Sequence, residues 1–434
     1  MSVDRLLFKL RIYLLSHFKG IRELTSLMSD LPLNSNVIIA RQAIFDRKLN
    51  VYAYELLFRE NKHQQYSNVS ATSGDDATSQ VINHSFMELG IERVIGNNIA
   101  FINLTRNFVL SDDPLPFTQD RVVLEILEDI VVDDDIINAT QKLVDQGYII
   151  ALDDFIFDES LRPLVKLAKI IKIDLLALTK QELIEHVNLL KKENVLLLAE
   201  KVETQEQYEL CRQLGFDYFQ GYFFSRPSII EDQAVPESQL NLLSIISKLQ
   251  DPNVMFEDIG QLIQQNAGLS YKLLRLLNSA AMSLPKKIDS INQGLTILGL
   301  NAIKTWTTLI SLNGMNVTTD EVMAQALVRA KMSEQLAPCY NQQSESGFLI
   351  GLFSMIDTMM NRSMDELLTT LPLNKDIKQA LSTKQGDLGQ LLLNVILYEQ
   401  GLWEEVDTSN VTLEKFSTCY INATEWTIET QIAL

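Results

Sequence analysis

The sequence has few of the groups that redox, zinc or nucleotide-cofactor chemistry requires. Its three cysteines, Cys211, Cys339 and Cys419, lie far apart and form no CxxC pair. They indicate reduced thiols in the core or on the surface of a cytoplasmic protein. No GxGxxG or P-loop pattern occurs, which argues against ATP or NAD as a cofactor.

Basic charge and long apolar runs are also scarce. Lys and Arg number 37 against 56 Asp and Glu, a formal net charge of -19. This argues against broad electrostatic binding to nucleic acid or anionic membrane, although a local basic site for a phosphate stays open. The most apolar stretch, LLFKLRIYLL, is interrupted by Lys9 and Arg11 and is not expected to span a bilayer. We expect a helical extension over residues 1–33 that packs on the protein's own body; the alternative is an amphipathic helix on a partner or membrane surface.

A chain of 434 residues is too long for one hydrophobic core, so two or three domains are expected. Residues 34–227 repeat one pattern: an apolar run ends in a polar residue, and a helical stretch follows. The Val/Ile/Leu-rich, non-alternating runs are typical of strands buried on both faces. Eight runs predict an α/β barrel of the TIM type, with strand ends converging on one mouth. The runs are NVIIARQAIF, VYAYELLFR, IAFINLT, VVLEILE, GYIIALDDF, IIKIDLL, VLLLAEKVE and FDYFQGYFF.

The polar residues at the strand ends carry the chemistry. A single Glu at a strand end is usually solvated at the edge of the sheet. Many carboxylates at one mouth, in contrast, would not stay ionised without cations. Mg²⁺ and Mn²⁺ take all-oxygen ligand sets, and two such ions can promote an in-line displacement at phosphorus. A lysine there could orient the water or neutralise the developing charge. The strand-end residues are Glu55, Asn103, Glu125, Asp153 with Asp154, Lys172 with Asp174, Glu200 with Glu203, and Gln220.

These motifs resemble the EAL domain of cyclic-di-GMP phosphodiesterases. YELLFR stands at the motif that names the family, and INLT, LEILE, LDDF, KID, AEKVET and QGYFFSRP follow in the family's order. The resemblance implies that two Mg²⁺ or Mn²⁺ ions are held by Glu55, Asn103, Glu125, Asp153, Asp154 and Glu200. It also implies that Lys172, Glu203 and Gln220 serve catalysis and that Gln42 and Arg59 bind the substrate.

The departures from the family pattern concern the surroundings of the site. The naming triplet is Glu-Leu-Leu, the tract after Arg59 is ENKHQQYSN, and Lys201 replaces a glycine. After Asp154 the family has Phe-Gly-Thr-Gly, whereas this chain has FIFDESLRP. Isoleucine does not adopt a positive φ cheaply, so the loop at Ile156 and Phe157 is expected to take another path and to bury these side chains locally.

The second half is expected to be all helical. After a linker over residues 228–238, apolar residues recur at three- and four-residue spacing through 239–434. The stretch LSYKLLRLLNSAAMSLPKKIDSINQGLTILGLNAIKTW resembles the HDOD domain, a relative of HD-type metal phosphohydrolases. The four histidines are His17, His63, His84 and His186, so this half has none and lacks the ligands of an HD metal site. It is therefore expected to dock a partner protein; the alternative is that it only stabilises the barrel.

Two hypotheses for function remain. One is a bacterial regulator of the cyclic-di-GMP pathway, for example of motility or biofilm formation, with a degenerate EAL barrel of weak or no hydrolysis and a protein-docking HDOD domain. The other is an active two-metal phosphodiesterase that produces linear pGpG. The retained ligand set favours the enzyme. The regulator is modestly favoured by three features together: the different loop after Asp154, the altered tract after Arg59 and the fusion to an HDOD domain.

Overall fold

The computed structural model describes most of the chain from Val37 onward. The described residues are 37–60, 90–111, 115, 117–128, 130–156, 158–225, 245–246, 248–249, 254–279, 282, 284, 287–313, 320–371 and 373–433. The expected N-terminal extension (1–33), the linker (228–238) and Phe157 lie outside these residues. The domain boundaries at 34–227 and 239–434 stay predictions.

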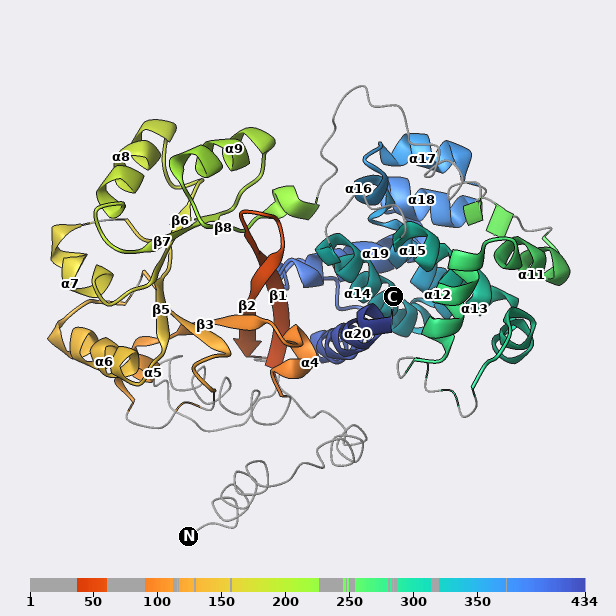
Figure 1. Ribbon diagram of the computed structural model, residues 1–434, viewed down its shortest axis with the longest axis horizontal. Helices are drawn as coiled ribbons and strands as arrows, with labels where there is room; N and C mark the ends of the chain where they lie inside the picture. The colour runs from red at the N-terminus through yellow and green to blue at the C-terminus, as the bar shows by residue number, and fades with distance from the viewer. Residues whose placement is uncertain are drawn as a thin grey trace, which may run out of the picture. The chain divides into compact units, whose positions relative to one another are not determined.

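Eight strands close into a barrel in sequence order, as expected (Figure 1). Each begins within one of the apolar runs, because those side chains are buried both toward the barrel axis and toward the surrounding helices. The strands are β1 (Val37–Asp46), β2 (Val51–Glu60), β3 (Ile99–Leu104), β4 (Val122–Ile126), β5 (Ile149–Leu152), β6 (Ile170–Asp174), β7 (Leu196–Glu200) and β8 (Tyr218–Phe219).

Strand β1 departs from the all-parallel order of a TIM barrel. It pairs antiparallel with β2 along its length and antiparallel with β8 at only two residue pairs, Phe45–Phe219 and Asp46–Tyr218. The reason is local: a tight turn over residues 47–50 joins β1 to β2, and only antiparallel strands can be joined by so short a connection. The Asp46 carboxylate accepts hydrogen bonds from two backbone N–H groups of that turn, those of Lys48 and Asn50. Consequently β1 runs away from the mouth toward which β2 to β8 point.

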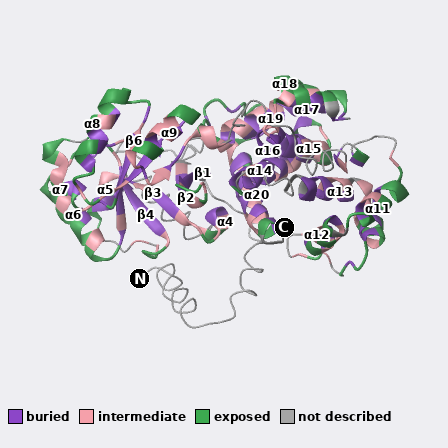
Figure 2. Ribbon diagram, turned by 45° about the horizontal axis from the view of Figure 1, so that its top comes forward, coloured by how far each residue is buried: buried purple, intermediate pink, exposed green. Residues whose placement is uncertain are grey.

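The barrel interior has an apolar layer beneath a polar one. The apolar layer consists of Ile44, Ala53, Phe101, Val123, Ala151, Ile170 and Leu198. On β2 to β7, the residue two positions further along each strand is polar, and a spacing of two keeps it on the same face. Figure 2 shows the strands mainly in the buried colour, with exposed residues on the outer helices. The alternation therefore places one polar side chain from each strand in a single layer at the mouth.

Helices cover the outside of the barrel. Two of them begin with capping boxes, in which Thr179 pairs with Glu182 and Thr204 with Gln207, and these satisfy free N–H groups of the first turn. The elements are α4 (Glu92–Ile95), α5 (Arg106–Leu110), α6 (Asp134–Asp145), η1 (Glu159–Leu161), α7 (Arg162–Val165), α8 (Lys180–Leu190), α9 (Gln205–Leu214) and η2 (Tyr222–Ser225).

The described residues from 245 to 433, here called the helical region, contain helices and no strand. Helix α15 packs closely on α14, since a Cβ at Gly347 or Gly351 would collide with the α14 backbone. None of the described helices combines the length and the apolar character needed to cross a membrane. The elements are α11 (Phe256–Gln264), α12 (Ala267–Leu277), α13 (Ile291–Asn313), α14 (Asp320–Leu336), η4 (Ala337–Tyr340), α15 (Ser344–Phe353), α16 (Ile356–Met360), α17 (Met364–Thr370), α18 (Lys375–Thr383), α19 (Gly386–Glu399) and α20 (Leu413–Ala433).

The helical region contacts the part of β1 that β8 leaves unpaired. The Tyr398 hydroxyl of α19 donates to the Ile39 carbonyl at 3.0 Å. The backbone N–H of Arg41 donates to the Tyr420 hydroxyl of α20 at 3.1 Å. Unpaired backbone groups at a sheet edge need partners, so these two tyrosines replace part of a missing strand ladder.

Candidate active site

Four carboxylates surround one lysine at the barrel mouth. Lys172 Nζ lies 2.7 Å from Glu125, 2.7 Å from Asp153, 3.0 Å from Glu200 and 3.5 Å from Glu55. The lysine side chain is fully buried. Asn103 joins the group by donating from Nδ2 to Glu55 Oε1 at 3.4 Å. The structure therefore brings together Glu55, Asn103, Glu125, Asp153, Lys172 and Glu200, here called the carboxylate cluster.

Burial and charge act in opposite directions on these groups. Burial lowers the pKa of the Lys172 ammonium, but the surrounding carboxylates more than offset this and raise it above its usual value. Burial raises the pKa of the Glu125 carboxyl well above its usual value, although Lys172 opposes the shift. The same two causes act on Glu200. A single lysine is thus insufficient to hold every carboxylate of the cluster in its ordinary ionised state.

The cluster holds buried oxygens that lack hydrogen-bond partners. Apart from the two oxygens nearest Lys172, such atoms are Asn103 Oδ1, Glu125 Oε2, Glu200 Oε2 and Oδ1 of the neighbouring Asp154. Lys172 Nζ lies 2.7 Å from Glu125 Oε1 and 2.7 Å from Asp153 Oδ1, so its ammonium serves those two oxygens and leaves the others without a donor. Buried polar atoms without partners are rare and need an explanation. Amide and carboxylate oxygens are the ligands of Mg²⁺ and Mn²⁺, and this set fits such ions.

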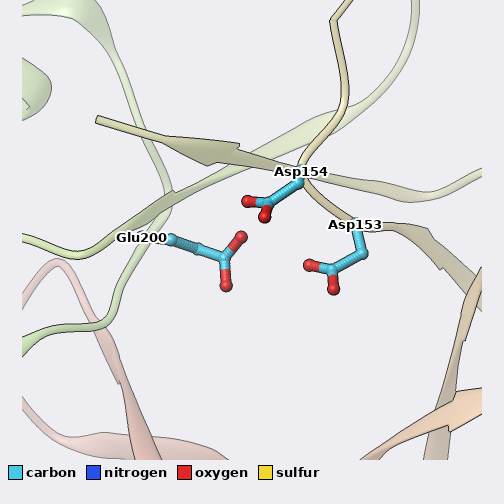
Figure 3. A group of neighbouring side chains, drawn as sticks. All are labelled: Asp153, Asp154 and Glu200. Carbon is cyan, nitrogen blue, oxygen red and sulfur yellow. The ribbon is translucent and has the colours of Figure 1, made fainter. Parts of the chain in front are cut away.

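Asp153 and Asp154 face the same space although they are neighbours. Side chains of adjacent strand residues normally point to opposite faces. Here the backbone N–H of Asp153 donates to the Ile126 carbonyl of β4, and Asp154 then takes a φ of 40°, which breaks the alternation. Aspartate tolerates this region better than most residues. Ligand atoms of Asp153, Asp154 and Glu200 lie within 4.8 Å of one another, and Figure 3 shows the three carboxylates directed at one space.

Lys201 brings a second cation to the edge of the cluster. Its Nζ lies 2.6 Å from Asp174 and 3.8 Å from Asp154. Its φ is 54°, the left-handed region in which glycine is easily accommodated. The backbone therefore explains why a glycine suits this position, and the chain has a charged side chain there instead.

The remaining predicted residues lie beside the cluster. Gln220 Nε2 donates to Glu55 Oε2 at 2.7 Å and to Gln42 Oε1 at 2.8 Å, which links β8, β2 and β1. Glu203 is exposed and lines a pocket together with Gln42. A Cβ at Gly221 would collide with the Val202 backbone, so the chain after Gln220 requires a glycine. The side chain of Arg59 lies outside the described part of the chain.

Comparison with known proteins assigns the chain to a family. The EAL domain family matches residues 101–227, and the HDOD domain family matches residues 235–394. The uncharacterized protein YuxH of Bacillus subtilis is 37% identical over 405 residues, which are 90% of this chain and 98% of YuxH. The protein belongs to the EAL–HDOD family. The cyclic di-GMP phosphodiesterase CdgJ of Vibrio cholerae is 32% identical to this EAL–HDOD protein over 374 residues, which cover 85% of this chain and 86% of CdgJ.

Solved structures that are similar to part of the EAL–HDOD protein include two EAL proteins. BlrP1 of Klebsiella pneumoniae, in a complex with manganese and cyclic-di-GMP, is 21% identical with a TM-score of 0.37. The match covers 45% of this chain and 56% of BlrP1. An EAL domain protein from Listeria monocytogenes is 23% identical with a TM-score of 0.34, covering 46% and 92% of the two chains.

The expected burial of the loop after Asp154 is wrong at Ile156. This side chain is 59% exposed, and Ile156 is absent from the residues that have a positive φ. The unusual backbone of the EAL–HDOD protein lies two residues earlier, at Asp154. Phe155 is the buried residue of the loop: its N–H donates to the Lys172 carbonyl, and its carbonyl lies 3.1 Å from His186 Nε2. With Phe155 anchored on both sides, Ile156 is directed toward solvent.

Sequence reasoning missed the residues that connect the cluster to the helical region. Tyr54 precedes Glu55 on β2 and points to the opposite face, where its hydroxyl donates to Glu321 Oε2 of α14 at 2.6 Å. The Arg41 guanidinium lies 4.2 Å from the centre of the Tyr54 ring. The alternation along β2 could have placed Tyr54 outside the barrel, but no sequence pattern identified Glu321 as its partner.

Proposed function

We propose that this EAL–HDOD protein hydrolyses cyclic-di-GMP to linear pGpG with two Mg²⁺ or Mn²⁺ ions. The observation that carries the proposal is the set of buried oxygens without hydrogen-bond partners at the barrel mouth. They are acceptors without donors, which a divalent cation would satisfy. The resemblance to CdgJ, which is named for this activity, supports the choice of substrate.

The ligands divide into two overlapping groups. Glu55, Asn103, Glu125 and Asp153 would hold one ion, and Asp153, Asp154 and Glu200 the other. Two such ions supply activation of a water molecule and stabilisation of the leaving oxygen of a phosphodiester. Lys172, which stays protonated, would orient that water and stabilise negative charge on the phosphate. Gln220 holds Glu55 in place through its amide N–H. Arg59 is proposed to bind a phosphate of the substrate.

The test compares two glutamates at the end of β4. Glu125 is buried in the cluster, whereas Glu128 is exposed. Glu125→Gln should reduce hydrolysis of cyclic-di-GMP on the order of a hundredfold, since small displacements of reacting groups cost that much. Glu128→Gln makes the same chemical change outside the carboxylate cluster, and because Glu128 acts on Asp154 only through its charge, it should alter the rate far less than Glu125→Gln. The product pGpG is followed chromatographically with Mn²⁺ and with EDTA. An inert wild type, or a fully active Glu125→Gln variant, would refute the proposal.

A second candidate is the regulator with weak or no hydrolysis. Lys172 and Lys201 favour it, because together they already offset part of the charge that cations would otherwise balance. In that case the helical region docks a partner protein, and the barrel binds cyclic-di-GMP without rapid turnover. Calorimetric binding of the nucleotide by a wild type that forms no pGpG would select this candidate.

A further inference from the structure

A pocket of about 480 Å³ lies beside the carboxylate cluster, where β1 and the chain after β8 part. The barrel contributes Gln42, Glu203 and Tyr222 to its lining. The helical region contributes Gln325 of α14, and Gln400 and Leu402, which follow α19. The volume is within the usual range of small-molecule sites. Two parts of the chain that are distant in sequence thus form the opposite walls of one pocket.

The pocket adjoins the predicted reaction site at Gln42. Gln42 lines the pocket and accepts a hydrogen bond from Gln220, which also donates to Glu55 of the carboxylate cluster. Glu203 lies three residues after Glu200, whose carboxylate belongs to the cluster. A ligand that extends from the cluster past Gln42 would therefore enter this pocket.

The wall from the helical region is held in place against β2. A Cβ at Gly401 would lie 3.1 Å from Leu57 Cδ1, and Gly401 has a φ of 76°. A larger residue is therefore both crowded and strained there, and the close approach fixes Gln400 and Leu402 beside the barrel. The hydrogen bond from Tyr54 to Glu321 fixes α14 on the same strand. These two contacts fix the position of the wall relative to the barrel.

We infer that the helical region forms half of the pocket that receives one guanine nucleotide of the substrate, so that it determines substrate affinity. The inference rests on the proposed function and deepens it. A cyclic dinucleotide is larger than the diester at the carboxylate cluster, so at least one nucleotide must lie outside the cluster. A guanine presents both hydrogen-bond donors and acceptors at its edges. The pocket offers a carboxylate from Glu203, amides from Gln42, Gln325 and Gln400, and the ring of Tyr222, on which a base can stack.

The experiment narrows the pocket from its helical side in the full-length chain. Leu402 is 43% exposed, so Leu402→Trp should be tolerated by the fold while it fills the pocket. Ile297→Trp is the matched control, because Ile297 is 52% exposed in the helical region and does not line this pocket. Hydrolysis is measured with cyclic-di-GMP and with bis(p-nitrophenyl) phosphate, a small diester that needs only the carboxylate cluster. Binding of cyclic-di-GMP is measured by calorimetry in the Glu125→Gln background, which separates binding from turnover.

Leu402→Trp should raise the KM and Kd for cyclic-di-GMP roughly ten- to hundredfold, the effect of losing the contacts of one stacked base. Its kcat/KM for the small diester should stay within about twofold of the wild type. Ile297→Trp should match the wild type with both substrates. A wild-type Kd in Leu402→Trp, or an equal loss in both variants, overturns the inference while the proposed function stands. A wild type that hydrolyses the small diester but does not bind cyclic-di-GMP overturns both.

Discussion

Replacing Lys172 by methionine tests whether this lysine stabilises the carboxylate cluster in the absence of metal. The substitution retains most of the side-chain volume and removes the ammonium that lies within 3.5 Å of four carboxylates. Removing one partner of a buried ion pair typically costs about 3–5 kcal/mol. For a cooperative unit of roughly 150–250 residues, each kcal/mol lowers the melting temperature by about 2–4 °C. The metal-free Lys172→Met variant should therefore melt roughly 6–20 °C below the wild type.

The assay is thermal unfolding in EDTA and in excess Mn²⁺. The difference between variant and wild type should shrink in Mn²⁺, because a ligand that binds only the folded state stabilises it and supplies the missing positive charge. Lys169→Met is the control, since Lys169 is exposed and immediately precedes β6, which carries Lys172. If Lys172→Met and Lys169→Met melt within about 2 °C of each other in EDTA, protonation of the carboxylates, and not Lys172, neutralises the cluster.

Three further outcomes are expected. Lys201→Gly should tighten Mn²⁺ binding about fivefold, because it removes a cation that lies 3.8 Å from Asp154. The variant should not destabilise the fold, because glycine suits the φ of 54° at this position. A weaker Mn²⁺ affinity, measured by calorimetry, would contradict this prediction. Burial lowers the pKa of His186, although the hydrogen bond to the Phe155 carbonyl opposes this shift. The free energy of unfolding should therefore fall as the pH drops below about 6.5, by at most about 1.4 kcal/mol per pH unit. His186→Gln should remove this pH dependence in urea titrations, and an unchanged pH dependence would assign it to other groups. Tyr420→Phe should cost about 1 kcal/mol of unfolding free energy, because a β1 N–H loses its acceptor, and an unaltered urea midpoint would show that water replaces it.

Much of the barrel and its mouth could be predicted from the apolar runs. Each run is short and rich in branched residues, and its polar end follows a core residue at a spacing of two, as Glu125 follows Val123. This spacing is fixed by strand geometry and does not depend on the rest of the chain. The clustering of the polar strand ends at one mouth of the barrel could therefore be predicted from the sequence alone.

Other features depend on information that the patterns do not carry. The direction of β1 could have been predicted, because the four residues that separate it from β2 permit only a hairpin between antiparallel strands. The analogy with a TIM barrel suggested eight parallel strands instead. The exposure of Ile156 follows from the anchoring of Phe155 by β6 and His186, contacts between segments distant in sequence. The pairing of Tyr54 with Glu321 joins residues 267 positions apart, and no local periodicity encodes such a pair.

The two tyrosines on β1 have a consequence for attempts to cut the protein into parts. A barrel prepared without the helical region would lose both hydroxyls and would present the backbone groups of Ile39 and Arg41 to solvent. A bare strand edge is a template for pairing with other chains, and it promotes aggregation. Low yield or low activity of such a fragment would then result from aggregation at the exposed edge of β1. In the full-length chain the two tyrosines cover this edge.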